Sequence, residues 1–232
     1  MTTTEGWRPS PRVPGSGQLD DRERVLTARV HTMVGIEPGT VMVKALAPGS
    51  VPRYLRGEVS AGQWGQAPPF SAHAVAGTVA RLQDTGDLRT PGDFCQAFRL
   101  DFPGSPFRPD APVLHLLEFA AVRPAEFTVA FGAPSVPDPE AGLPPNSPEV
   151  RETAYAMVEA AAEAGVDPNT YRMEIAPWPY SGTGLSAAGD LALPLWEKDS
   201  GPIPRGARIV EHGPAGPRPI AVYHGSTPGW QQ

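Results

Sequence analysis

Cysteine is nearly absent from this chain of 232 residues: Cys95 is the single one, so no intramolecular disulfide can form. This excludes a small secreted fold stapled by disulfides, and we interpret Cys95 as a buried apolar residue. No apolar run approaches the ~20 residues that a membrane-spanning helix needs, so we expect no membrane partner. The first 18 residues lack the apolar segment of a secretory signal. We therefore expect a cytoplasmic protein, with export by a route without such a segment as the alternative.

Charge of one sign is not concentrated anywhere in the sequence. The formal net charge is −6 and no segment gathers lysine and arginine, so we expect no nucleic-acid partner. The five histidines form no His-x-His or His-x-x-x-His pair, and one cysteine cannot supply a zinc knuckle, so no metal site is expected. The GxSxG, GxxxxGK[ST] and GxGxxG motifs are also missing, which argues against the common hydrolase, P-loop and Rossmann folds.

Proline and glycine are abundant, with 30 and 25 residues spread along the chain. Each proline removes a backbone donor and each glycine loosens φ, so long uninterrupted helices and strands are disfavoured. Hydrophobic residues still make up 40 % of the chain, which is enough for a packed core. We predict an α+β fold with a core of short strands, mixed or antiparallel, and with peripheral helices and Pro/Gly-rich loops. Residues 1–18 should form a disordered leader, and residues 19–232 a single domain.

The first ordered element should be a helix over residues 21–34. Asp20 is a favourable N-cap, and glycine follows the segment at the point where a helix would stop. Leu26, Val30 and Met33 recur at helical spacing, so we expect this stripe to face the core.

Two further helices are predicted from their capping signals. Thr90 followed by proline and an acid predicts a short helix over 91–99 that buries Phe94, Cys95 and Phe98. A serine cap, a leading proline and a run of alanines predict a longer helix over 148–164. We expect this helix to pack through Val150, Ala154, Met157 and Val158.

Runs of apolar and β-branched residues predict strands over 40–47, 53–59, 72–82, 113–120, 126–131 and 171–175. Pro-Gly at positions 48–49 is a turn signal, which would join the first two strands in a hairpin. The chain should end in another hairpin, over 207–212 and 220–224. His212 and His224 could face each other across it.

Three short motifs are candidates for chemistry. Arg56 is followed by Gly57 in a predicted strand, so a ligand could approach the backbone beside a guanidinium, which is well suited to phosphate; the alternative is an exposed arginine before a turn. Ser181 and Thr183 stand in a Ser-Gly-Thr-Gly segment that is either a simple turn or a loop whose hydroxyls contact a polar ligand. Glu197 follows Leu-Trp and is either a surface carboxylate or a catalytic one.

In this order, arginine, hydroxyl loop and glutamate, the motifs resemble the arrangement of the mono-ADP-ribosyltransferase and NAD glycohydrolase toxin superfamily. The resemblance implies that Arg56 binds the diphosphate of NAD, and that Ser181 and Thr183 hold the loop at the nicotinamide ribose. Glu197 would then stabilise positive charge on that ribose as nicotinamide leaves. Leu195 stands where the transferases carry Gln or Glu, so hydrolysis of NAD is favoured over transfer. NAD would be the substrate, with no bound cofactor.

The competing interpretation is a non-catalytic binding or structural module, for example a phage, secretion-system or assembly component. Its Pro-rich loops and exposed aromatic residues would contact a protein partner, since interfaces favour aromatic anchors. The tryptophans considered for this role are Trp64, Trp178, Trp196 and Trp230. Convergence of Arg56, Thr183 and Glu197 in one cleft would favour the enzyme.

Overall fold

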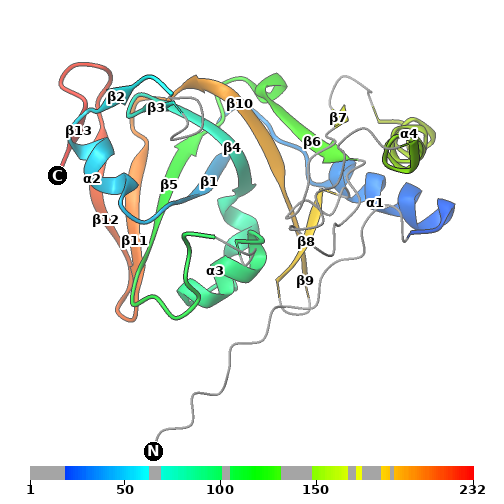
Figure 1. The fold of residues 1–232 in the computed structure, drawn as a ribbon, viewed down its shortest axis with the longest axis horizontal. Coiled ribbons are helices and arrows are strands. Elements are labelled where there is room, and N and C mark those ends of the chain that lie inside the picture. Colours follow the sequence, from blue (N-terminus) through cyan, green and yellow to red (C-terminus); the bar gives the residue numbers. More distant parts are fainter. Residues whose placement is uncertain are drawn as a thin grey trace, which may run out of the picture.

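The computed structural model describes residues 19–62, 69–100, 105–131, 148–166, 171–173, 184–188 and 191–232. Its core is a curled nine-stranded sheet (Figure 1). The strands lie in the spatial order β13 (Trp230–Gln231), β12 (Gly216–Tyr223), β11 (Arg208–Gly213), β5 (Leu114–Ala120), β1 (Val41–Leu46), β4 (Ala74–Arg81), β10 (Trp196–Pro202), β6 (Phe127–Phe131) and β7 (Tyr171–Met173). Neighbouring strands are antiparallel except β6 and β7, which are parallel.

Smaller elements flank this sheet. Two short antiparallel pairs lie outside it, β2 (Val59–Ser60) with β3 (Phe70–Ser71), and β8 (Leu185–Ala188) with β9 (Leu191–Pro194). The described residues also contain the 3₁₀ turns η2 (Leu82–Thr85) and η3 (Pro124–Glu126), and the helices α1 (Asp21–Met33), α2 (Ser50–Leu55), α3 (Pro91–Ala97) and α4 (Pro148–Glu163). The predicted α+β class is therefore confirmed. The predicted leader, residues 1–18, lies outside the described residues.

Helix α1 begins as predicted, but it buries a different face. Asp20 Oδ1 accepts from the amide of Glu23 over 2.8 Å, and the Glu23 carboxylate accepts from the Asp20 amide over 2.9 Å. This reciprocal capping box satisfies amides that the helix itself leaves unpaired. Leu26 and Met33 are 50 % and 84 % exposed, so the predicted core stripe is wrong. The buried residues are Val25, Ala28 and His31.

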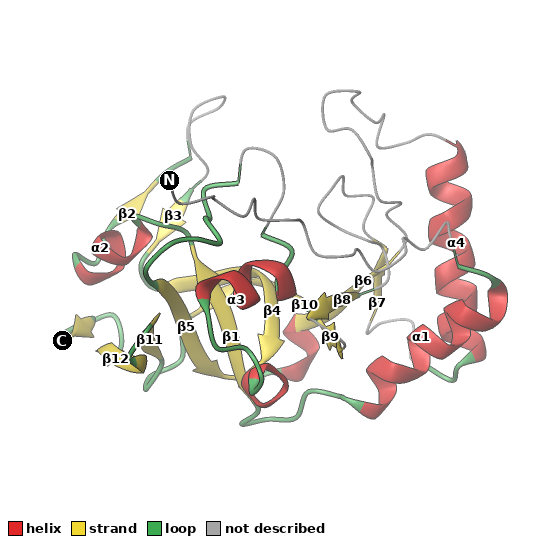
Figure 2. Ribbon diagram, turned by 90° about the horizontal axis from the view of Figure 1, so that it is seen from below, coloured by secondary structure: helices red, strands yellow, loops and turns green. Residues whose placement is uncertain are grey.

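A polar residue decides which face of α1 is buried. The His31 ring packs edge-on against Trp196 with 5.9 Å between ring centroids, and its Nε2 lies 2.9 Å from the carbonyl oxygen of Gly184. A pattern that admits only apolar residues to the core cannot find a face centred on histidine. Figure 2 shows α1 and α4 together at the end of the molecule remote from α2.

The predicted strand over 53–59 is wrong, and with it the first hairpin. After Gly49, whose φ is +82°, the chain turns into helix α2. Pro52 lies in the first turn of this helix, where its missing N–H is not needed. Val51 and Tyr54 are buried at helical spacing, three residues apart. The antiparallel neighbours of β1 are β4 and β5.

The other two predicted helices are present. Thr90 and Asp93 form a capping box at the start of α3, and Phe94, Cys95 and Phe98 are buried as expected. In α4, Met157 is buried and Val158 is half-buried. The side chains of Val150 and Ala154 lie outside the description. None of the helices in the described part of the chain combines the length and apolarity required to cross a membrane.

The C-terminal hairpin is present, but its histidines do not pair across it. In the ladder between β11 and β12, His212 lies opposite Pro217, next to the turn. His224 follows the end of β12, so the register leaves it at the other end of the hairpin. The His212 ring instead packs on Phe94, with 4.9 Å between centroids.

The sheet separates two apolar clusters. On one face, Val43 and Ala45 of β1 pack with Phe94 and Phe98, next to α3. On the other face, Met42 and Leu46 join a larger cluster that includes Tyr54, Val79, Leu117, Phe127 and Trp196. Because side chains alternate along a strand, β1 supplies both clusters. Its single polar residue is Lys44, on the face shared by Met42 and Leu46.

Candidate functional site

A cavity of ≈ 310 Å³ opens beside the middle of β1. This strand pairs with β5 from Val41 to Leu46, but its ladder with β4 consists only of the pairs Met42–Arg81 and Val43–Ala80. The cavity lies beyond the end of that short ladder. Residues from both apolar clusters line it, with Tyr54 and Phe70 from one side and Phe98 and Phe107 from the other.

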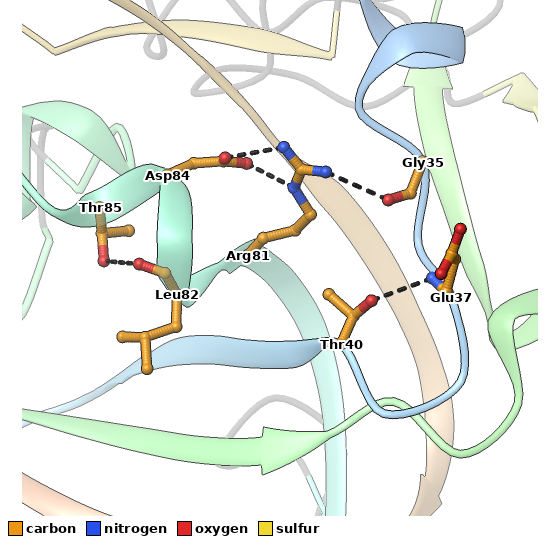
Figure 3. Close-up of polar contacts among 7 residues, drawn as sticks. All are labelled: Gly35, Glu37, Thr40, Arg81, Leu82, Asp84 and Thr85. Atoms are coloured by element: carbon orange, nitrogen blue, oxygen red, sulfur yellow. Dashed lines mark hydrogen bonds and ion pairs between the residues drawn. The ribbon is translucent and has the colours of Figure 1, made fainter.

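Arg81, the last residue of β4, fixes the end of the β1–β4 ladder that lies away from the cavity (Figure 3). Its guanidinium makes a bidentate contact with Asp84, from Nε to Oδ2 over 2.6 Å and from Nη2 to Oδ1 over 2.7 Å. The third nitrogen donates to the carbonyl oxygen of Gly35 over 3.2 Å. Planar two-point contacts of this kind hold geometry well. Arg81 therefore ties β4 to η2 and to the segment after α1, while the other end of the ladder opens into the cavity.

Lys44 is the cationic side chain in the cavity wall. The whole chain has only two lysines, Lys44 and Lys198. Within the described residues the Lys44 ammonium forms no hydrogen bond and no ion pair. Burial lowers the pKa of Lys44, and the nearby carboxylate of Glu197 opposes this shift. The cavity thus contains an amine whose charged form is poorly stabilised by the protein.

Gly77 allows the Lys44 ammonium to lie close to the backbone of β4, because glycine has no side chain. This glycine lies inside β4 with φ +91°, and a Cβ placed on it would meet Lys44 Nζ at 3.1 Å and Glu197 Oε2 at 3.9 Å. Glycine within a strand commonly marks such a close approach. The amine and the carboxylate therefore converge over the backbone of Gly77.

Glu197, one of the residues predicted from the sequence, stands beside this cavity. It lies in β10 opposite Thr78 of β4 and Thr128 of β6. The Thr78 hydroxyl, which lines the cavity, donates to Glu197 Oε1 over 2.9 Å. Thr78, a residue of the cavity wall, thus orients the Glu197 carboxylate. The negative charge of this carboxylate raises the pKa of Lys44.

Arg56, the predicted phosphate-binding residue, occupies a different setting from the one expected. It caps the C-terminus of α2 rather than lying in a strand. Its side chain is 65 % exposed, and its Nη2 contacts Glu58 Oε2 at 3.2 Å. The described contacts do not bring Arg56 to Glu197. The link between them is indirect, because α2 also carries Tyr54, which lines the cavity.

Ser181 and Thr183 lie outside the described residues, so their convergence with Glu197 stays a prediction. Gly184, which follows them, is held by the contact of its carbonyl oxygen with His31 Nε2. A Cβ on Gly184, whose φ is +67°, would overlap Val129 and His31.

Two of the tryptophans proposed as interface anchors are buried instead. Trp196 packs against His31, and Trp230 Nε1 donates to the carbonyl oxygen of Ala72 over 2.9 Å. They stabilise the core and are not exposed to a partner. Trp64 and Trp178 lie outside the description.

Sequence reasoning missed Lys44, although a signal was present. Lysine is scarce in this chain, and Lys44 interrupts the otherwise apolar strand sequence Val-Met-Val-Lys-Ala-Leu. Among the described residues there is no cluster of three or more His, Cys, Asp or Glu side chains that could hold a metal. In comparisons with known proteins, no family model, no curated protein and no solved structure matches this chain significantly.

Proposed function

We propose that the cavity beside Lys44 binds a small organic molecule that presents an oxygen-bearing polar group to this amine. The observation that carries the proposal is Lys44, a residue that lines a largely apolar cavity and whose ammonium has no hydrogen-bond or ion-pair partner in the described residues. Small-molecule sites typically combine aromatic walls with a few placed polar groups, and ≈ 310 Å³ is within their usual range.

The energetic argument favours a functional reason for this lysine. Removing a charge from water without a partner destabilises a fold, so a residue chosen for stability alone would be apolar here. Strand β1 is otherwise built from Val, Met, Ala and Leu. Perturbed titratable groups in cavities are recurrent markers of functional sites.

The proposal is tested with the matched probes benzoate, benzyl alcohol and benzylamine, whose binding is followed by ligand-observed NMR. We expect benzoate to bind best and benzylamine worst, because Lys44 repels an ammonium. Lys44→Met should abolish the preference for benzoate, whereas Arg218→Met, which removes an exposed arginine, should leave it unchanged. Equal binding of the three probes to the native protein would contradict the proposal.

A second function, hydrolysis of NAD, is proposed from the position of Glu197. Its carboxylate is held by Thr78 at the cavity wall, where it could stabilise positive charge on a ribose. The cavity is small for a dinucleotide, so it would take the nicotinamide end. A ligand that extends past α2 could then reach Arg56, which ends that helix.

Nicotinamide release from NAD, followed by chromatography, tests this second function. Release above the uncatalysed rate supports NAD hydrolysis over simple binding. Absence of both NAD binding and nicotinamide release would exclude it. The non-catalytic module with a protein partner would then be the leading alternative.

A further inference from the structure

We infer that Lys44 is an imine-forming amine and that the molecule held in the cavity is a small aldehyde or ketone. This inference rests on the first proposed function, since it requires the cavity to bind a small molecule. It goes further, because it names the reacting atom, Lys44 Nζ, and the chemical class of the ligand.

The two lysines of the chain are in opposite situations. Lys198 is buried, its ammonium lies 2.7 Å from Glu126 Oε2, and it donates to the carbonyl oxygen of Asp199 over 2.7 Å. These two contacts occupy the Lys198 nitrogen. Lys44 has no such contacts in the described residues and lines the cavity. The protein thus contains one protected lysine and one available lysine.

The surroundings of Lys44 make its neutral form more accessible than that of a lysine in water. The rings of Tyr54, Phe70 and Phe98 make that part of the cavity apolar, and burial lowers the pKa of the amine. Desolvation of lysine in a hydrophobic pocket is an established way to activate it towards carbonyl groups. Gly77 has no side chain, so the Lys44 nitrogen lies close to the β4 backbone, 3.1 Å from where a Cβ would stand.

The reaction is balanced without an oxidant or a metal. The lone pair of neutral Lys44 Nζ attacks the carbonyl carbon, the C–O π pair moves to oxygen, and a proton passes from nitrogen to oxygen to give a carbinolamine. The hydroxyl then gains a proton and leaves as water while the C=N bond forms. Water takes the proton that the ammonium loses before attack, and Glu197, whose carboxylate raises the Lys44 pKa, increases the fraction of the amine that is protonated.

The test uses benzaldehyde with sodium cyanoborohydride, which reduces an imine to a stable benzylamine adduct. The intact protein is treated near neutral pH, and the labelled residue is found by peptide mass mapping. We expect labelling at Lys44 and none at Lys198. Because burial lowers the pKa of Lys44, more of this amine is neutral at a given pH, and Lys44 should react faster than free Nα-acetyl-lysine in the same tube. Its rate should saturate with benzaldehyde concentration.

Three outcomes would overturn the inference: labelling of Lys44 no faster than that of Nα-acetyl-lysine, equal labelling of Lys198, or a rate that does not saturate. Lys44→Arg is the matched variant, because it keeps the positive charge but cannot form an imine. It should still bind benzoate while losing the label. Since benzoate cannot form an imine, its binding reports on the cavity alone. Bound benzoate without labelling would leave the proposed function intact and reject only the imine.

Discussion

Gly77 and Lys44 share one small volume between β1 and β4. A Cβ on Gly77 would lie 3.1 Å from Lys44 Nζ, and the φ of +91° at this position is one that other residues rarely adopt. Position 77 is therefore constrained both by its own backbone and by the amine above it.

Gly77→Ala should destabilise the fold by about 1–3 kcal/mol, because alanine is strained at this φ and its methyl group displaces Lys44. Urea denaturation measures the loss. Gly216→Ala is a matched control, since Gly216 also has φ +91° but has no atom within 4 Å of the added methyl. The larger loss should occur at Gly77. Equal losses would mean that the contact with Lys44 contributes nothing.

Lys44→Met should change how stability depends on pH. Since burial lowers the Lys44 pKa below 10.5, the unfolded chain binds more protons at this residue between the lowered pKa and 10.5. The lysine contribution to stability must therefore rise with pH across that window. Urea denaturation at successive pH values up to 10.5 should show native protein gaining stability relative to Lys44→Met. Parallel behaviour of the two proteins would contradict this prediction.

If the protein hydrolyses NAD, Glu197→Gln should reduce turnover by at least ~100-fold while NAD binding is nearly unchanged, because the carboxylate acts on charge that develops in the transition state. Arg56→Lys should mainly weaken binding, because an ammonium cannot make a two-point contact with phosphate. Steady-state kinetics of nicotinamide release separates the two effects. The reverse assignment, with Glu197→Gln affecting only KM, would contradict the role given to the carboxylate.

Glu197→Gln should also accelerate the labelling of Lys44 by benzaldehyde at neutral pH. The Glu197 carboxylate raises the Lys44 pKa against the effect of burial, so its removal leaves more of the amine neutral. The rate is measured by mass spectrometry beside Thr78→Val, which removes the hydrogen bond to Glu197 but keeps its charge. Slower labelling in Glu197→Gln would indicate that its carboxylate transfers the proton itself.

His31 should make the fold sensitive to acid. Burial lowers the pKa of this ring from 6.5, although the carbonyl groups of Gly184 and Thr27 oppose the shift. The unfolded chain therefore binds more protons, and stability falls as the pH drops from 6.5 towards the lowered pKa. His31→Gln, which can still donate to Gly184, should flatten thermal unfolding midpoints between pH 7 and pH 5. The control, His224→Gln on the surface, should follow the native protein.

Elements with strong local signals could be predicted from the sequence, and elements set by distant contacts could not. The caps at Asp20 and Thr90 act through hydrogen bonds within three residues, so the starts of α1 and α3 follow from local sequence. Helix α2 has only six residues, which carry too little helical periodicity to be distinguished from the predicted strand. The buried face of α1 depends on Gly184, 153 residues away from His31.

The candidate site shows the same division. Glu197 is predicted from the sequence, and the scarcity of lysine marks Lys44, but only the structure shows that Lys44 lines a cavity and that its Nζ lies close to Gly77. Nothing in the local sequence indicates where two strands stop pairing. Arg56 is a candidate because of its residue type. The strand in which the sequence analysis places it is absent, because this segment forms the end of helix α2.

The short β1–β4 ladder divides the sheet into two flanks, one from β13 to β1 and the other from β4 to β7. The chain passes between these flanks after β1, after β4, after β5 and after β10. Because the chain crosses from one flank to the other repeatedly, neither flank is formed by one continuous segment of the chain. A single proteolytic cut at any position therefore leaves the two flanks covalently connected through the remaining crossings.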